Sequence, residues 1–269
     1  MTDFPKYYVW QHQDFDEIAV PHDHEILAAD SWRVINGSTW GLADHVQRFF
    51  TGLAAQAPRG GQLQHIDQAV FCQELHQQLR NISRDHPGLA LFPRISAEPY
   101  GDTWRIVLLV RPAPEPRSTT SLWIPTYPDP RTRPTVKGPD IGLMRRLVAE
   151  AHTDDVVLHD GTNVHETTTG ALLVWERPDE LVVCQASQQL ASISAQRIAQ
   201  HARSHDITVT SRSVTIQEIA TGEYPVWFAN TLHGISPVTT IGSVAGETSV
   251  VHHPAVAQWQ AAWWQKFAV

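Results

Sequence analysis

The sequence predicts an α+β protein built from two halves. Its 269 residues are enough for a sizeable core in one large domain or two small ones. Segments with helical spacing alternate with strand-like segments along the chain. Seven prolines fall between residues 112 and 134, where little periodicity is present. We therefore expect a smaller N-terminal α/β domain over 1–116, a linker over 117–134 and a larger C-terminal domain over 135–269.

The N-terminal half contains two expected helices and a strand. Residues 43–56 place Val46, Phe49, Phe50 and Leu53 at helical spacing. Residues 66–84 repeat that spacing, and residues 104–114 form an apolar strand that its prolines end.

The C-terminal half is richer in expected strands. The expected elements are a helix over 141–151, strands over 154–161, 206–215 and 223–234, a hairpin over 168–185, and helices over 195–205 and 255–268. We expect Ser192 or Ser194 to cap the helix over 195–205, because a serine hydroxyl can accept from a free N–H of the first turn.

Composition excludes several function classes. The net charge of -8 argues against a nucleic-acid partner. No apolar run reaches about 18 residues, so no membrane span is expected. The acidic first 18 residues do not resemble a secretory signal, and Cys72 and Cys184 lie in apolar stretches that predict buried free thiols. These features favour a cytoplasmic protein.

The 15 histidines do not predict a metal site. His22, Asp23, His24 and Glu25 lie together, but the sequence has no HExxH or CxxC motif to support metal ligation. We therefore expect no metal.

Two residues provide the minimum for pyridoxal phosphate (PLP) chemistry. Lys137 is one of three lysines, and the others, Lys6 and Lys266, lie near the termini. A lysine can attach the cofactor covalently and then move protons, if it is partly desolvated. Glu166 follows 29 residues later, at a strand end before hydroxyl residues. A carboxylate there could keep the pyridine nitrogen protonated. Taken singly, each residue is as compatible with an ordinary surface position.

Two later segments, LASIS at 190–194 and FANTLHGISPV at 228–238, complete a pattern. In this order the four segments resemble the class IV aminotransferase family, which has the PLP fold type IV. This family contains branched-chain and D-amino acid aminotransferases and aminodeoxychorismate lyases. The resemblance implies a two-domain α+β fold like that of D-amino acid aminotransferase, PLP as cofactor and a homodimer that acts on a small amino substrate.

The resemblance also implies roles for single residues. Lys137 would be the catalytic lysine and Glu166 the partner of the pyridine nitrogen. The phosphate would be held by Arg48, which follows a histidine three residues earlier, and by residues near a helix start and a loop: Ser192, Ile193, Ser194 and Thr231. Trp32, Arg94 and Arg111 are the candidates for substrate contacts.

The sequence departs from the family at two places that bear on function. Residues 138–141, Gly-Pro-Asp-Ile, replace the asparagine or tyrosine that often follows the lysine, and residues 29–33 differ from the usual glycine-containing stretch. Asn230 and Leu232 resemble the lyase branch, which favours release of pyruvate and 4-aminobenzoate from 4-amino-4-deoxychorismate, a step of folate biosynthesis. A branched-chain or D-amino acid aminotransferase and a non-catalytic binding protein remain the alternatives.

Overall fold

The computed structural model describes residues 4–20, 25–56 and 66–267, which form two compact units. Unit 1 comprises residues 1–114, 136–139 and 266–269, and unit 2 comprises residues 115–135 and 140–265. This division differs from the expected one. Residues 117–134 are part of unit 2, whereas the segment with Lys137 belongs to unit 1.

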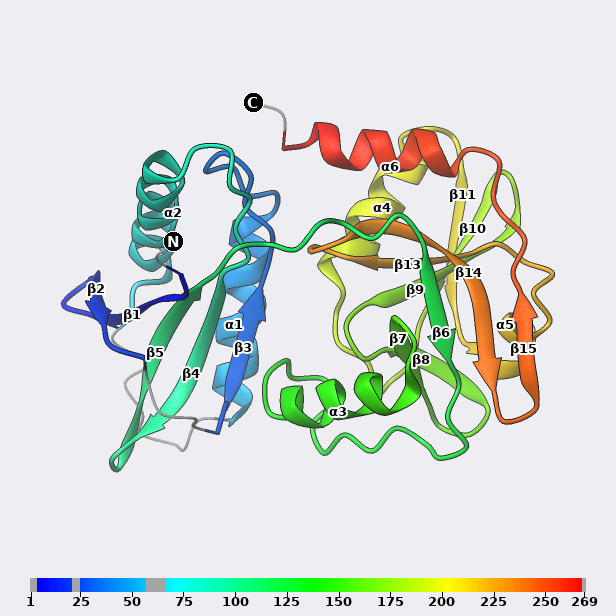
Figure 1. The fold of residues 1–269 in the computed structure, drawn as a ribbon, viewed down its shortest axis with the longest axis horizontal. Coiled ribbons are helices and arrows are strands. Elements are labelled where there is room, and N and C mark those ends of the chain that lie inside the picture. Colours follow the sequence, from blue (N-terminus) through cyan, green and yellow to red (C-terminus); the bar gives the residue numbers. More distant parts are fainter. Residues whose placement is uncertain (1–3, 21–24, 57–65, 268–269) are drawn as a thin grey trace. The chain divides into compact units, whose positions relative to one another are not determined.

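The described part of unit 1 is a five-stranded antiparallel sheet with two helices (Figure 1). The strand order is β2-β1-β5-β4-β3, which makes β3 an edge strand. The strands are β1 (Lys6–Gln11), β2 (Asp14–Ile18), β3 (Ala28–Ser31), β4 (Arg94–Tyr100) and β5 (Thr103–Val110). The helices are α1 (Leu42–Gln56) and α2 (Gln68–Asp85), which confirm the two expected helices.

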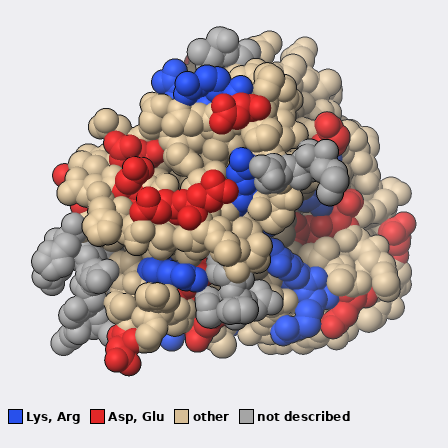
Figure 2. Space-filling model, turned by 60° about the vertical axis from the view of Figure 1, so that its left-hand side comes forward, with Lys and Arg blue, Asp and Glu red and all other residues tan. Residues whose placement is uncertain are grey.

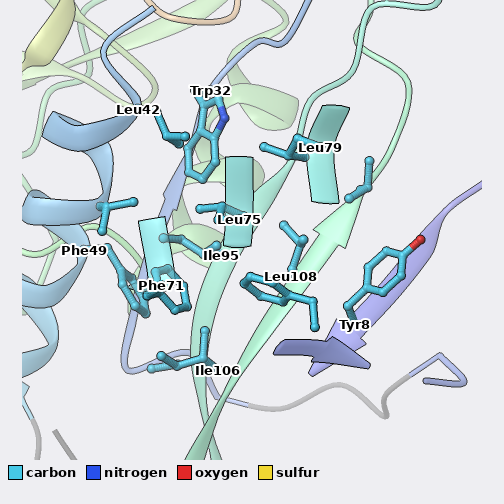
Figure 3. Close-up of a cluster of buried hydrophobic side chains, with 14 of the residues drawn as sticks. Tyr8, Trp32, Leu42, Phe49, Phe71, Leu75, Leu79, Ile95, Ile106 and Leu108 are labelled. Carbon is cyan, nitrogen blue, oxygen red and sulfur yellow. The ribbon is translucent and has the colours of Figure 1, made fainter. Parts of the chain in front are cut away.

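The core of unit 1 lies between the helices and one face of this sheet (Figure 3). Phe49 from α1 and Phe71 and Leu75 from α2 meet Ile95 and Leu108 from the strands, all fully buried or nearly so. The two helices form because their apolar residues recur at helical spacing, and the Asp67 side chain accepts from two N–H groups at the start of α2.

Unit 2 contains a ten-stranded mixed sheet. Its order is β11-β10-β9-β13-β14-β6-β7-β8-β12, with β15 paired to β14. The strands are β6 (Thr120–Trp123), β7 (Asp155–His159), β8 (Asn163–Thr167), β9 (Ala171–Arg177), β10 (Glu180–Cys184), β11 (Thr208–Arg212), β12 (Val214–Thr215), β13 (Val226–Asn230), β14 (Gly234–Ser243) and β15 (Gly246–Ser249).

Four helices belong to unit 2. They are α3 (Ile141–Ala151), α4 (Ile193–Arg203), α5 (Ile216–Ala220) and α6 (Val256–Gln265). The Ser192 hydroxyl accepts from Ala195 N at 3.2 Å, so the expected cap is Ser192. Helix α4 packs on β9, β10, β11 and β13, and α6 packs on β14.

The proline-rich stretch is not a simple linker. It includes β6, which pairs in parallel with both β14 and β7 inside the large sheet. Thr120 and Leu122 of β6 are fully buried. A strand of four residues between prolines is too short to produce a period-two pattern, and for that reason the sequence predicted no strand there.

No helix in the described part of the chain is long and apolar enough to cross a membrane. On the face drawn in Figure 2, Lys and Arg side chains are interspersed with Asp and Glu side chains. Cys184 is a buried free thiol, and Cys72 is a partly buried one. Among the described residues, no group of three or more His, Cys, Asp or Glu side chains is placed to hold a metal ion. His22, Asp23 and His24 lie outside the described residues.

Candidate functional site

Glu166 is buried near the end of β8, with an arginine beside it. Its Oε1 accepts from Arg131 Nη1 at 2.8 Å and from Leu190 N at 2.9 Å. Arg131 also forms a bidentate pair with Asp129, with distances of 2.7 to 3.1 Å. Sequence reasoning missed Arg131 and Asp129, because both lie in the stretch taken for a linker.

Burial and charge oppose each other at this carboxylate. Burial raises the pKa of Glu166, and the positive charge of Arg131 partly offsets that effect. For Arg131, burial alone would lower the pKa, but Asp129 and Glu166 raise it overall. Arg131 is therefore a permanent cation that favours the ionised form of Glu166 in a site with little water.

The Leu190 contact links Glu166 to the segment that leads into α4. Ser194 is buried in the first turn of that helix. Among the described residues, the Ser194 hydroxyl and the N–H groups of Ile193 and Ser194 have no hydrogen-bond partner. Free N–H groups at a helix start, together with the helix dipole, favour an anion such as a phosphate.

Thr231 lies in a short loop between β13 and β14. Asn230 closes this loop, because its Oδ1 accepts from Leu232 N at 3.1 Å and from His233 N at 2.7 Å. Since α4 packs on β13, the large sheet positions both expected phosphate-binding segments of unit 2.

Unit 1 holds the segment with Lys137 along its edge strand. Ala29 N of β3 donates to Lys137 O at 2.6 Å. Gly138 has a φ of +135°, and a Cβ there would lie 2.8 Å from Ala29 N. Only glycine therefore fits this close approach, which gives a physical reason for the first departure from the family pattern.

Arg48 projects from α1 toward the same strand. It forms a bidentate pair with the fully buried Asp30 of β3, through Nε at 2.7 Å and Nη2 at 2.8 Å. His45 Nδ1 lies 2.9 Å from the same carboxylate. Burial lowers the pKa of His45, Asp30 partly offsets this effect, and the positive charges of Arg48 and Lys137 lower the pKa further. Lys137 and Arg48 are thus brought to one region around Ala29 and Asp30.

The three candidates for substrate contacts differ in placement. Trp32 is fully buried in the core of unit 1 (Figure 3). Arg94 is the first residue of β4 and pairs with Leu109 of the neighbouring strand β5. Arg111 follows Leu109 by two residues, so both arginines lie at the same end of the β4–β5 pair. The guanidinium of Arg111 stands 4.7 Å from the Phe92 ring.

The donor set of the described residues suits PLP. Both hydrogen bonds of Glu166 to other described residues reach Oε1, so Oε2 can accept from a protonated ring nitrogen. The start of α4 offers N–H donors and a hydroxyl to a phosphate. These groups of unit 2 match a pyridinium and a phosphate.

Several solved structures share this fold. A hypothetical aminotransferase from Mycobacterium tuberculosis, in a form bound to α-ketoglutarate and PMP, is 12% identical, with a TM-score of 0.80 and coverage of 97% of this chain and 98% of that one. An aminotransferase from Brucella abortus bound to PLP is 14% identical (TM-score 0.74, coverage 98% and 100%). A putative branched-chain aminotransferase from Thermotoga maritima is 16% identical (TM-score 0.73, coverage 97% and 96%).

The sequence itself matches the family model of the class IV aminotransferases over residues 27–241. No curated protein matches the chain. The match covers most of the chain and, with the PLP-containing neighbours, agrees with the expected fold, cofactor and enzyme class. The chain belongs to the class IV aminotransferase family of PLP-dependent enzymes.

Proposed function

We propose that the protein is a PLP-dependent lyase that releases pyruvate and 4-aminobenzoate from 4-amino-4-deoxychorismate, for folate biosynthesis. The observation that carries this choice is the loop after β13, where Asn230 accepts from the N–H groups of Leu232 and His233. This asparagine–x–leucine pattern resembles the lyase branch. The proposal includes a homodimer in the cytoplasm.

Bound PLP would withdraw electrons from bonds at the carbon that carries the substrate's amino group. Lys137 Nζ would take the proton from the substrate ring at that carbon, and the C–O bond that joins the neighbouring ring carbon to the enolpyruvyl group would break. The departing enolpyruvate would take a proton back and leave as pyruvate. Glu166 Oε2 would keep the pyridine nitrogen protonated, supported by the neighbouring Arg131. The cofactor phosphate would be held by Arg48, Ser194, Thr231 and the N–H groups at the start of α4, where Ser192 is the cap and Ile193 the first residue.

Arg94 and Arg111 are the candidates to bind the substrate carboxylates, because a guanidinium can donate two parallel N–H groups to a carboxylate. Any substrate of this family also needs a carboxylate partner, so the arginines do not separate a lyase from an aminotransferase. The second candidate is an aminotransferase for a branched-chain or D-amino acid, which the branched-chain aminotransferases among the structural neighbours favour.

The products separate these candidates. The purified protein, supplied with PLP and 4-amino-4-deoxychorismate and no keto acid, should release pyruvate and 4-aminobenzoate in equal amounts. Exchange of amino groups between an amino acid and 2-oxoglutarate, without such release, would replace the lyase by the aminotransferase. A protein that binds PLP and catalyses neither reaction would have a binding role instead.

A further inference from the structure

The buried carboxylate of Asp155 lies at the centre of a hydrogen-bond network in unit 2. It begins β7, is fully buried and accepts from the hydroxyls of Thr168 and Thr169. Val156 N donates to it at 2.9 Å, and Arg117 Nη2 lies 3.8 Å away. A carboxylate is costly to bury unless donors surround it, so these contacts fix Asp155 and the two threonines together.

The two threonines occupy the turn that follows Glu166. This turn joins β8 to β9 and is closed by Gly170, whose O accepts from both the N–H and the hydroxyl of Thr167. A Cβ on Gly170 would lie 2.5 Å from the Phe228 ring, so the turn sits directly on β13. Through Thr168 and Thr169, Asp155 therefore holds the end of the strand that carries Glu166.

The same turn is bonded to the loop with Thr231. Asn230 Nδ2 donates to Thr169 O at 3.2 Å, while its Oδ1 accepts from two N–H groups of the loop. Arg117 closes a second path, because its N donates to His233 Nδ1 at 3.2 Å and its guanidinium stands 4.7 Å from the Phe228 ring. A continuous set of contacts thus runs from Asp155 to both sides of the Thr231 loop.

We propose that Asp155 is a positioning residue which, through Thr168, Thr169 and Asn230, holds the Thr231 loop and Glu166 as one rigid unit. Glu166 is the proposed partner of the ring nitrogen, and Thr231 is a proposed phosphate ligand. Their separation must match the fixed distance between these two groups of PLP, which gives the network a purpose beyond stability. This inference rests on the proposed function for its purpose, but the rigidity of the loop can be measured without any cofactor.

The test compares two double variants with the wild type. Thr168→Val with Thr169→Val keeps the shape of both side chains and removes both hydroxyls, whereas Thr168→Ser with Thr169→Ser keeps the hydroxyls. In the cofactor-free protein, amide hydrogen exchange at Leu232 and His233 should be at least tenfold faster in the valine variant. Exchange in β10 should stay the same in all three proteins, and the serine variant should match the wild type within about threefold.

The second readout is the dissociation constant of PLP, followed by the visible absorbance of the bound cofactor. The dissociation constant should rise at least tenfold in the valine variant and stay within about twofold of the wild-type value in the serine variant. Unchanged exchange in the loop of the valine variant overturns the inference, even if the melting temperature of that variant falls. A wild type that does not bind PLP contradicts the proposed function, and the exchange data then still decide whether Asp155 holds the loop. If the double valine variant does not fold, Thr169→Val and Thr169→Ser provide the same comparison.

Discussion

At the scale of single residues, charge arranges the candidate site. Glu166 is buried beside Arg131, and the partly buried Arg48 pairs with the fully buried Asp30. Lys137, Glu166 and Arg48 could be proposed from the sequence, because each is a distinctive residue type within a recognisable segment. Arg131 and Asp30 could not, because their roles depend on partners 35 and 18 residues away that only the fold brings close.

Substitution of Glu166 by glutamine tests its proposed role. Glu166→Gln removes the negative charge that we propose faces the ring nitrogen and weakens the pairing with Arg131, but it leaves the proposed phosphate ligands unchanged. Loss of one ionic hydrogen bond costs about 1.5–3 kcal/mol, so turnover should fall roughly tenfold to a hundredfold. PLP binding should change much less. Glu176→Gln is a matched control, because Glu176 pairs with Arg212 on the surface of the same unit and should leave turnover within about twofold. Equal turnover in wild type and Glu166→Gln would rule out the role.

At the scale of elements, local patterns predicted the long helices and the hairpin, whereas the order of the strands within the sheets could not be predicted from the sequence. Helices α1, α2 and α3 each show a stripe of apolar residues, which one sequence is enough to reveal. Strands β3 and β6 have four residues each, and their place is set by pairing with distant strands. Short buried strands of this kind carry too few residues for a periodic signal.

The contact between Gly138 and β3 can be tested by a pair of glycine variants. Gly138→Ala would bring a Cβ to 2.8 Å from backbone atoms at a φ of +135°. It should lower the free energy of unfolding by about 1–3 kcal/mol, through crowding and backbone strain. Gly142→Ala is the control, because nothing lies within 4 Å of the added Cβ and the residue is helical. That variant should be neutral or more stable by up to about 1 kcal/mol. Urea unfolding of both variants decides, and equal stability of the two would contradict the close approach.

At the scale of the whole molecule, buried histidines should make stability depend on pH. His253 is buried, its Nε2 lies 3.1 Å from Pro178 O, and its Nδ1 accepts from Ala255 N at 3.2 Å. The neutral ring satisfies both contacts, and burial lowers the pKa of His253. The unfolded chain therefore binds a proton first as the pH falls below about 6.5. The contribution of His253 to the free energy of unfolding is therefore fully present above that pH and is lost as the pH falls below it.

His253→Asn should reduce this pH dependence, because an amide can both donate and accept at the same place. The free energy of unfolding of the wild type should fall between pH 7 and 5.5, with a slope from this residue of at most about 1.4 kcal/mol per pH unit. The slope should be smaller in His253→Asn and unchanged in His252→Asn, since His252 is exposed. Parallel curves for His253→Asn and the wild type would show that His253 does not contribute.

The central claim is that this chain is a PLP enzyme whose cofactor is attached to Lys137. Of the three lysines, only Lys137 lies away from the termini, and the structure holds its backbone against β3. The most direct measurement is borohydride reduction of the PLP-loaded protein, followed by peptide mass spectrometry. The account predicts that reduction removes the visible absorbance and leaves the pyridoxyl group on the peptide with Lys137. The Lys137→Ala protein should show neither the change in absorbance nor a labelled peptide. A pyridoxyl group on Lys6 or Lys266, or no labelled lysine at all, would contradict it.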